Sequence, residues 1–141
     1  MEVVQHDDYS ITITAKDNTE KIRPINIGDN RKLTDKCTTG EITALRSVTA
    51  SLAWIARQVR PGLSYRVSKL QCVAGKSTIK DLRQCNKVLE YALETSEQGF
   101  YYASDGINWK DAVVCAIADA SFGNEFDEVA DDMEPGRSQQ G

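Results

Sequence analysis

The longest regular pattern of apolar residues in the chain lies within residues 38–71. Apolar side chains recur there at intervals of three and four, which places them on one stripe of an α-helix: Ile42, Leu45, Val48, Leu52, Ile55 and Val59. Thr38 and Glu41 fit a capping box in front of this stripe. Arg60-Pro61-Gly62 stops the helix, and a helical period resumes from residue 63 to Gly75. The pattern predicts a helical hairpin.

A second amphipathic pattern follows in residues 77–99. Ser77 or Thr78 provides a helix cap, and Gly99 provides a stop. The apolar positions between them again have a helical period: Ile79, Leu82, Cys85, Val88, Leu89, Ala92 and Leu93. We therefore expect a third helix with one strongly apolar face.

The N-terminal part of the chain has the patterning of strands. Residues 2–6 and 9–14 are rich in β-forming residues, and Asp7-Asp8 between them has turn chemistry. These residues predict a β-hairpin. Residues 15–37 are polar and contain one proline and one glycine, which is typical of a connector. We expect at most one short helical turn in it, around residues 19–22.

The C-terminal part predicts two further strands and an acidic tail. Residues 100–102 form a short aromatic run, and residues 112–118 are apolar throughout, as in a strand buried on both faces. This second strand leads directly into Asp119. A carboxylate at the end of a buried strand is one way to hold a metal ion. The alternative is that Asp119 only begins the turn after the strand, since no second carboxylate is placed beside it by a recognisable spacing.

The predicted first helix has a second distinctive face beside its apolar stripe. Arg46, Ala50, Ala53 and Arg57 fall together on it, with Trp54 at the margin. Small residues flanked by arginines and one aromatic ring would let a polyanion approach the helix closely. The alternative is packing: the alanines would simply favour the helix, and Trp54 would belong to the core.

The distribution of charge supports a polyanion partner more than the net charge does. The chain has 17 Lys and Arg, 21 Asp and Glu and a formal net charge of −4. Residues 31–76, however, hold nine basic and two acidic residues, whereas residues 111–141 hold eight acidic residues and one arginine. A basic helical hairpin in an acidic chain is typical of a nucleic-acid-binding element, although it also suits an acidic partner protein.

Several classes of protein are disfavoured by the remaining composition. The sequence shows no signal peptide and no apolar run long enough for a membrane span, so we expect an intracellular protein. Cys37, Cys72, Cys85 and Cys115 are far apart, which favours reduced thiols over a zinc site. His6 is the only histidine, so a histidine-based catalytic triad is excluded.

Four short stretches match the motifs of a known family. They are Leu45-Arg46-Ser47 with Ser51-Leu52-Ala53-Trp54-Ile55-Ala56; Arg60-Pro61-Gly62-Leu63-Ser64-Tyr65 with Val67-Ser68; Lys87-Val88-Leu89-Glu90-Tyr91 with Gly99-Phe100-Tyr101-Tyr102; and Ala118-Asp119-Ala120-Ser121-Phe122-Gly123. In this order they resemble the C-terminal part of a copia-like retrotransposon reverse transcriptase and the start of its RNase H domain. Gly62 and Ser121 stand where the family usually has Asp, and Arg66 stands where it usually has Ala.

The resemblance implies an α+β fold with three segments. Residues 1–37 would be a β-hairpin and connector at the end of the primer-grip region, and residues 38–99 would be a three-helix, thumb-like bundle. Residues 100–141 would be the first strands of a truncated RNase H-like sheet. A primer–template duplex, RNA–DNA or DNA, would lie on the first helix of the bundle and contact Arg46, Ala50, Ala53, Trp54 and Arg57.

The resemblance also bears on catalysis. Asp119 would be a remnant of the RNase H site, whose carboxylates hold Mg²⁺ in this family. The polymerase carboxylates and the other RNase H carboxylates would lie in missing palm and RNase H segments of the parent polyprotein. We therefore expect a fragment that is catalytically inactive and does not hold Mg²⁺ on its own.

Two other interpretations remain open at this point. The chain could be a small non-enzymatic helical module whose basic hairpin binds an acidic protein. It could also be an artefact of gene annotation that never accumulates as protein.

Overall fold

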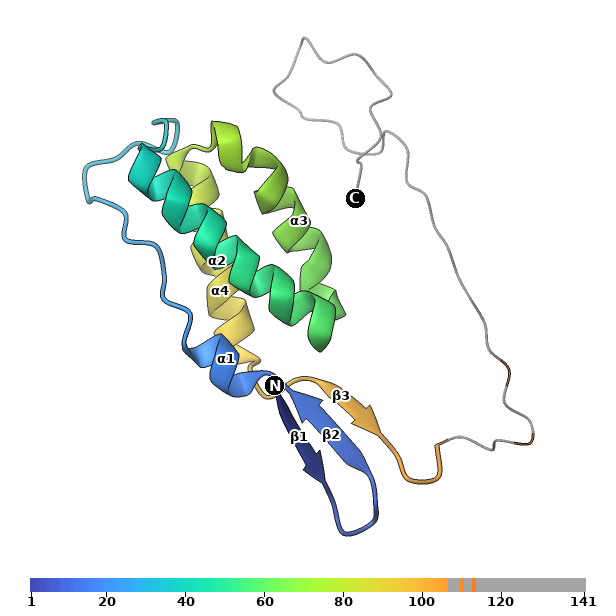
Figure 1. Ribbon diagram of the computed structural model, residues 1–141. Helices are drawn as coiled ribbons and strands as arrows, with labels where there is room; N and C mark the ends of the chain where they lie inside the picture. Colours follow the sequence, from blue (N-terminus) through green and yellow to red (C-terminus); the bar gives the residue numbers. More distant parts are fainter. Residues whose placement is uncertain (107–109, 111–112, 114–141) are drawn as a thin grey trace. The chain divides into compact units, whose positions relative to one another are not determined.

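The computed structural model describes residues 1–106, 110 and 113 (Figure 1). Met1–Gly106 form one compact unit. Its elements in chain order are β1 (Glu2–Gln5), β2 (Ile11–Thr14), α1 (Lys16–Glu20), α2 (Thr39–Gln58), α3 (Ser64–Val73), α4 (Ile79–Glu94) and β3 (Phe100–Tyr102), with 3-10 turns at Pro61–Leu63 and Ala74–Lys76. The α+β class is confirmed. A thumb-like or RNase H-like fold stays a prediction, and the strand expected at 112–118 lies outside the described residues.

The predicted N-terminal hairpin is confirmed, although its second strand begins at Ile11 and not at residue 9. β1 pairs antiparallel with β2, with Val3 opposite Ile13 and Gln5 opposite Ile11. The turn between them is held by Asp8, whose Oδ1 accepts hydrogen bonds from the Ser10 backbone N–H at 3.0 Å and from the Ser10 hydroxyl at 2.7 Å. A short acidic side chain that binds the backbone two residues further on is a common way to stabilise a turn.

The third strand joins this hairpin from the far end of the unit. β3 pairs antiparallel with β2, so the sheet order is β1-β2-β3. The sequence interpretation placed residues 100–102 in a separate C-terminal segment, whereas the structure pairs them with the first segment. Gly99 allows this pairing, because a Cβ at this position would lie 2.0 Å from the carbonyl oxygen of Ile13.

The three long helices form the core of the unit, and each contacts the other two (Figure 1). α2 buries the predicted stripe, although Ile42 at its start is only half-buried. Most of the largest fully buried side chains come from the three helices and the turn at Pro61–Leu63; they include Leu45, Leu52, Ile55, Leu63, Val67, Ile79, Leu82 and Leu89. The helical hairpin and the third helix are therefore confirmed.

Both long helices that follow a loop begin at the expected caps. The backbone N–H of Glu41 donates to the Thr38 hydroxyl at 3.3 Å, and the Glu41 carboxylate accepts from the Thr38 N–H at 2.7 Å. Arg31 reinforces this cap, since its Nη1 lies 3.0 Å from Glu41 Oε1. At α4, Oδ2 of Asp81 accepts from the Thr78 N–H at 2.7 Å. These contacts satisfy amides that a helix N-terminus leaves unpaired.

The connector before α2 is tied to α4. The side-chain amide of Asn86 accepts from the Ile25 N–H at 2.8 Å and donates to the Ile25 carbonyl at 2.9 Å. The carbonyls of Asp35 and Leu33 accept from the first two amides of α4. The connector also contains α1, which begins at Lys16, earlier than the helical turn expected at 19–22. The segment that the sequence predicts to be a connector is thus hydrogen-bonded to α4 and belongs to the compact unit.

We expect Gly99→Ala to weaken the pairing of β3 with β2. The added methyl group would overlap the Ile13 carbonyl, so the backbone must move, at a cost of about 1–3 kcal/mol. Urea unfolding should show this loss, and amide exchange should be faster in β3. Gly40→Ala is the matched control: a Cβ there meets nothing within 4 Å, and the position lies in the first turn of α2. If both variants unfold like the wild type, the close approach at Gly99 is wrong.

The cap of α2 should make stability depend on pH. The Thr38 N–H, with smaller contributions from the Thr38 hydroxyl and Arg31, holds the pKa of Glu41 below its ordinary value of 4.5, against the opposing effect of burial. The unfolded chain therefore takes up this proton first as the pH falls. The stabilisation is present above pH 4.5 and is lost as the pH falls through the folded-state pKa.

Glu41→Gln tests this linkage, because glutamine can still accept at the cap but does not titrate. Unfolding free energies measured between neutral and acidic pH should fall less steeply for this variant. Glu90→Gln, an exposed change on α4, should leave the wild-type slope unchanged. Equal slopes for the wild type and Glu41→Gln would rule out the contribution of Glu41.

Candidate nucleic-acid interface

The predicted contact residues lie on one side of α2. Burial of the apolar stripe fixes the rotation of the helix, so the residues beyond the margins of the stripe face outward. Arg46, Ala50, Trp54 and Arg57 are exposed, and Ala53 is half-buried against the core. Trp54 keeps 43% of its surface exposed and is not one of the buried core residues. We call these five residues the α2 face.

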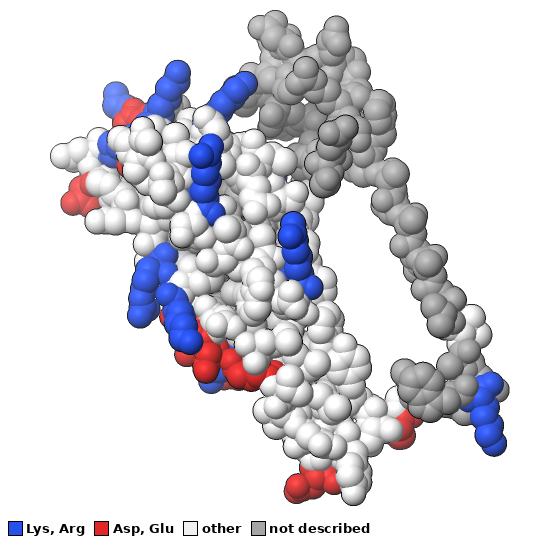
Figure 2. Space-filling view, in the orientation of Figure 1, with Lys and Arg blue, Asp and Glu red and all other residues white. Residues whose placement is uncertain are grey.

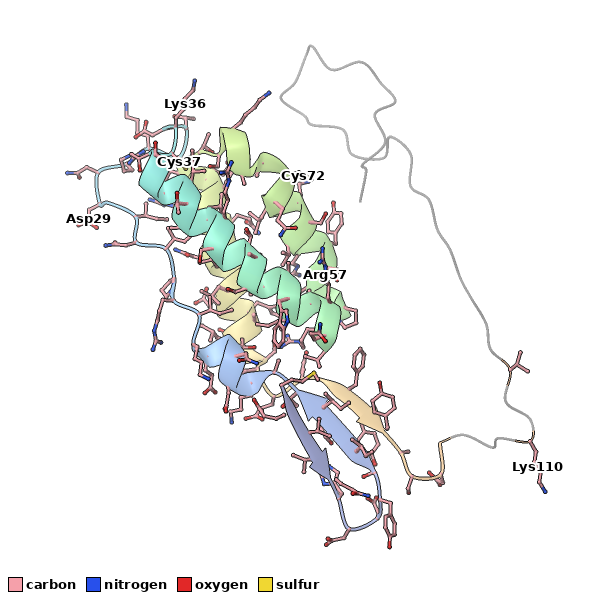
Figure 3. All side chains as sticks on the ribbon, viewed as in Figure 1. Asp29, Lys36, Cys37, Arg57, Cys72 and Lys110 are labelled. Carbon is pink, nitrogen blue, oxygen red and sulfur yellow. The ribbon has the colours of Figure 1, made fainter. Side chains whose placement is uncertain are left out.

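The two arginines of the α2 face are available to a ligand. Within the part of the chain that the structure describes, the guanidinium groups of Arg46 and Arg57 make no hydrogen bond or ion pair. They are separated by three helical turns, or about 16 Å along the axis, which equals the rise of about five base pairs of a duplex. Figure 3 shows Arg57 near the C-terminal end of α2.

The surroundings of the α2 face are positive. Residues 42–80 contain seven Lys and Arg and no Asp or Glu. Figure 2 shows the same pattern on the surface, where Lys and Arg side chains lie over α2 and α3 without acidic side chains between them. An acidic chain can therefore present a locally positive surface, and local potential attracts a polyanion whatever the sign of the net charge.

Two arginines of the basic segment 31–76, Arg60 and Arg31, have structural roles instead. Arg60 is buried, and it donates from Nη1 to the Thr95 carbonyl at 2.7 Å and from Nη2 to the Thr95 hydroxyl at 2.6 Å. It thus supplies a cation to the C-terminus of α4, where the helix dipole favours one. Arg31 is engaged by Glu41 and Asp35. Neither group is available to a ligand.

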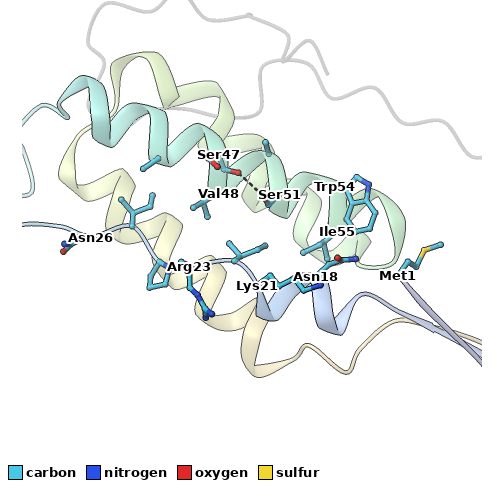
Figure 4. Close-up of a pocket in the computed structure, with 15 residues that line it drawn as sticks. Met1, Asn18, Lys21, Arg23, Asn26, Ser47, Val48, Ser51, Trp54 and Ile55 are labelled. Carbon is cyan, nitrogen blue, oxygen red and sulfur yellow. Dashed lines mark hydrogen bonds between the residues drawn. The ribbon is translucent and has the colours of Figure 1, made fainter.

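A groove of about 870 Å³ runs beside the α2 face, between α2 and the connector (Figure 4). Its α2 wall is formed by Ala44, Ser47, Val48, Ala50, Ser51, Trp54 and Ile55, and the opposite wall by Met1, Asn18 and residues 21–26. Ala50 and Trp54 belong to both the α2 face and the groove. The sequence interpretation missed this groove, although Ile22 and Ile25 in a polar segment are a signal that the segment packs.

The described residues give little support for a metal site or a reactive thiol. Asp119, predicted as a metal ligand, lies outside them, and among them no group of three or more His, Cys, Asp or Glu is placed to hold a metal ion. The Mg²⁺ site that the family resemblance implies would involve Asp119 and stays a prediction. Burial raises the pKa of the Cys85 thiol to about 11, so this thiol stays protonated at neutral pH.

The described helices offer no route across a bilayer, because none is both long and apolar enough to span one.

We expect Arg60 to matter for stability and not for binding. Arg60→Met would remove two hydrogen bonds from a charged donor and leave the Thr95 carbonyl with the Gln98 N–H alone, at a cost of about 2 kcal/mol. Arg57→Met, three residues earlier and exposed, should change stability by less than about 0.5 kcal/mol. Thermal or urea unfolding of both variants tests this, and equal stabilities would contradict the structural role of Arg60.

Comparison with known proteins does not identify a family or a function for this site. The chain matches no protein-family model, and no curated protein or solved structure is significantly similar to it.

Proposed function

We propose that the helical part of this chain binds a nucleic-acid duplex through the α2 face, as the thumb-like part of a copia-like reverse transcriptase. The observation that supports this most is the α2 face itself: two unpaired arginines, small residues between them and an exposed tryptophan on one rigid helix. The motif resemblance, which includes residues of this same helix, points the same way.

Each member of the α2 face has a physical role in such a complex. Arg46 and Arg57 would contact phosphate oxygens, which position a protein on a duplex without reading its sequence. Ala50 and Ala53 would let the helix backbone approach a groove of the duplex. Trp54 would pack its ring against sugars or an exposed base at the edge of the contact. Binding should therefore be weakly dependent on sequence.

The role proposed is binding and positioning, and no reaction step is assigned to the described residues. Primer–template RNA–DNA or DNA duplexes are the partners that the resemblance implies. Any RNase H chemistry with Mg²⁺ would involve Asp119, which lies outside the described part. A helical module that binds an acidic protein is the competing proposal, and it predicts a different response to salt and to competitors.

Arg46→Ala and Arg57→Ala should each weaken duplex binding for all sequences alike. Each lost phosphate contact should flatten the dependence of log K on log salt concentration by about one unit. Fluorescence anisotropy with an RNA–DNA hybrid and a DNA duplex, at several salt concentrations, measures both quantities. Arg83→Ala on α4 is the matched control, since it removes an exposed arginine from another helix.

Two outcomes would overturn the proposal. Unchanged affinity and slope in both arginine variants would show that the α2 face does not contact the duplex. Displacement of the duplex by an equal charge concentration of poly-glutamate would show that the surface binds acidic chains in general, as the competing proposal requires. Thermal unfolding of each variant should match the wild type, so that lost binding is not lost folding.

A further inference from the structure

The groove beside the α2 face is lined mostly by apolar residues, together with two cations, several polar groups and no acid. Its fifteen lining residues include Lys21 and Arg23 but no Asp or Glu. Within the described residues neither cation makes a salt bridge or a side-chain hydrogen bond. Asn18, Asn26 and Ser47 add polar groups, and the volume of about 870 Å³ is within the range of ligand-binding clefts.

The walls of the groove are held in place before any ligand binds. Ile25, on the connector wall, is buried and is fixed from α4 by the two hydrogen bonds of Asn86. On the α2 wall, the Ser51 hydroxyl donates to the Ser47 carbonyl at 3.1 Å (Figure 4). A ligand therefore pays little for ordering the site, which favours binding by a preformed surface.

The groove and the α2 face form one continuous surface. Trp54 stands between them, with the unpaired arginines of α2 on one side and the groove on the other. Figure 4 shows Trp54 on α2, with Lys21 and Arg23 along the facing connector. Cations and an exposed aromatic ring beside apolar surface are features that single-stranded nucleic acids use, through phosphate contacts and base stacking.

We propose that this groove binds an unpaired nucleic-acid strand that leads away from the duplex on the α2 face. Lys21 and Arg23 contact its phosphates, and one base stacks on Trp54. The inference rests on the proposed function, because the α2 face places the duplex beside the groove. An acidic peptide would satisfy the two cations but would leave the exposed indole ring without a flat partner.

The test compares four labelled probes on the full chain by fluorescence anisotropy. The first is a blunt duplex, and the second is the same duplex with a single-stranded extension of about six nucleotides, tested at either end of one strand. The third is the same tailed duplex with abasic residues in the extension. The fourth is the extension alone. The wild type should bind the tailed duplex at least about fivefold more tightly than the blunt one, which is the lower limit for one stacked base.

Three sets of variants separate the contacts. Lys21→Ala with Arg23→Ala should abolish the gain from either tail and leave blunt-duplex affinity nearly unchanged. Trp54→Ala should reduce the affinity for the tail with bases to that of the abasic tail, and Trp54→Phe should restore part of the difference. Arg83→Ala with Lys87→Ala is the matched control, which removes one arginine and one lysine that are exposed on α4.

Each result decides between the two proposals. Binding of the blunt duplex without a gain from the tail would overturn the groove and leave the α2 face intact. Binding of the extension alone that depends on Lys21, Arg23 and Trp54, without binding of the blunt duplex, would support the groove and overturn the α2 face. A gain that survives Trp54→Ala, or tails displaced equally well by poly-glutamate, would show that the groove binds anions without recognising bases.

Discussion

The fold and the proposed interface both depend on the burial of one stripe of α2. Leu45, Leu52 and Ile55 are almost completely inaccessible to solvent, and α2 packs against both α3 and α4. A helix can bury only one such stripe in a unit of this size, so this packing fixes its rotation. The arginines of the α2 face are exposed for that reason. Residues that never touch a ligand thus determine which side of α2 a ligand can reach.

The second constraint is the attachment of the connector to α4. Asn86 satisfies both backbone polar groups of Ile25, and the carbonyls of Leu33 and Asp35 cover the first amides of α4. A polar segment with few apolar residues would otherwise have little to hold it against the helices. These hydrogen bonds hold the connector at a fixed distance from α2, and the space left between them is the groove.

The sequence predicts correctly those elements of the fold that local residue patterns determine. Helical periodicity, the capping box at Thr38 and Glu41, and the alternation that forms β2 depend on neighbouring residues, and the structure confirms them. Of the two predicted caps for α4, Ser77 and Thr78, the structure has Thr78. The pairing of β3 with β2 joins residues about ninety positions apart, which no local pattern encodes. The sequence predicts a helix stop at Gly99, whereas α4 ends at Glu94 and this glycine permits a close approach of two strands.

The sequence also cannot show which charged residues of the candidate site are available to a ligand. A count of basic residues treats Arg46, Arg57 and Arg60 alike, although only tertiary packing decides which of them is paired. Arg60 lies between α2 and the 3-10 turn at Pro61–Leu63, and its guanidinium donates to Thr95 at the C-terminus of α4. Lys21 and Arg23, by contrast, were outside the predicted site and line the groove.

For Trp54, the exposure of the side chain says more about its function than its residue type does. A tryptophan at the margin of an amphipathic helix is ordinarily explained by packing, and that alternative was open from the sequence. Here the core closes without it, since the largest fully buried side chains are aliphatic or threonine. An exposed indole ring on a rigid helix costs little to order and offers a large flat surface. Its place between two surfaces that lack acidic side chains gives that ring a reason to be exposed, which packing alone does not.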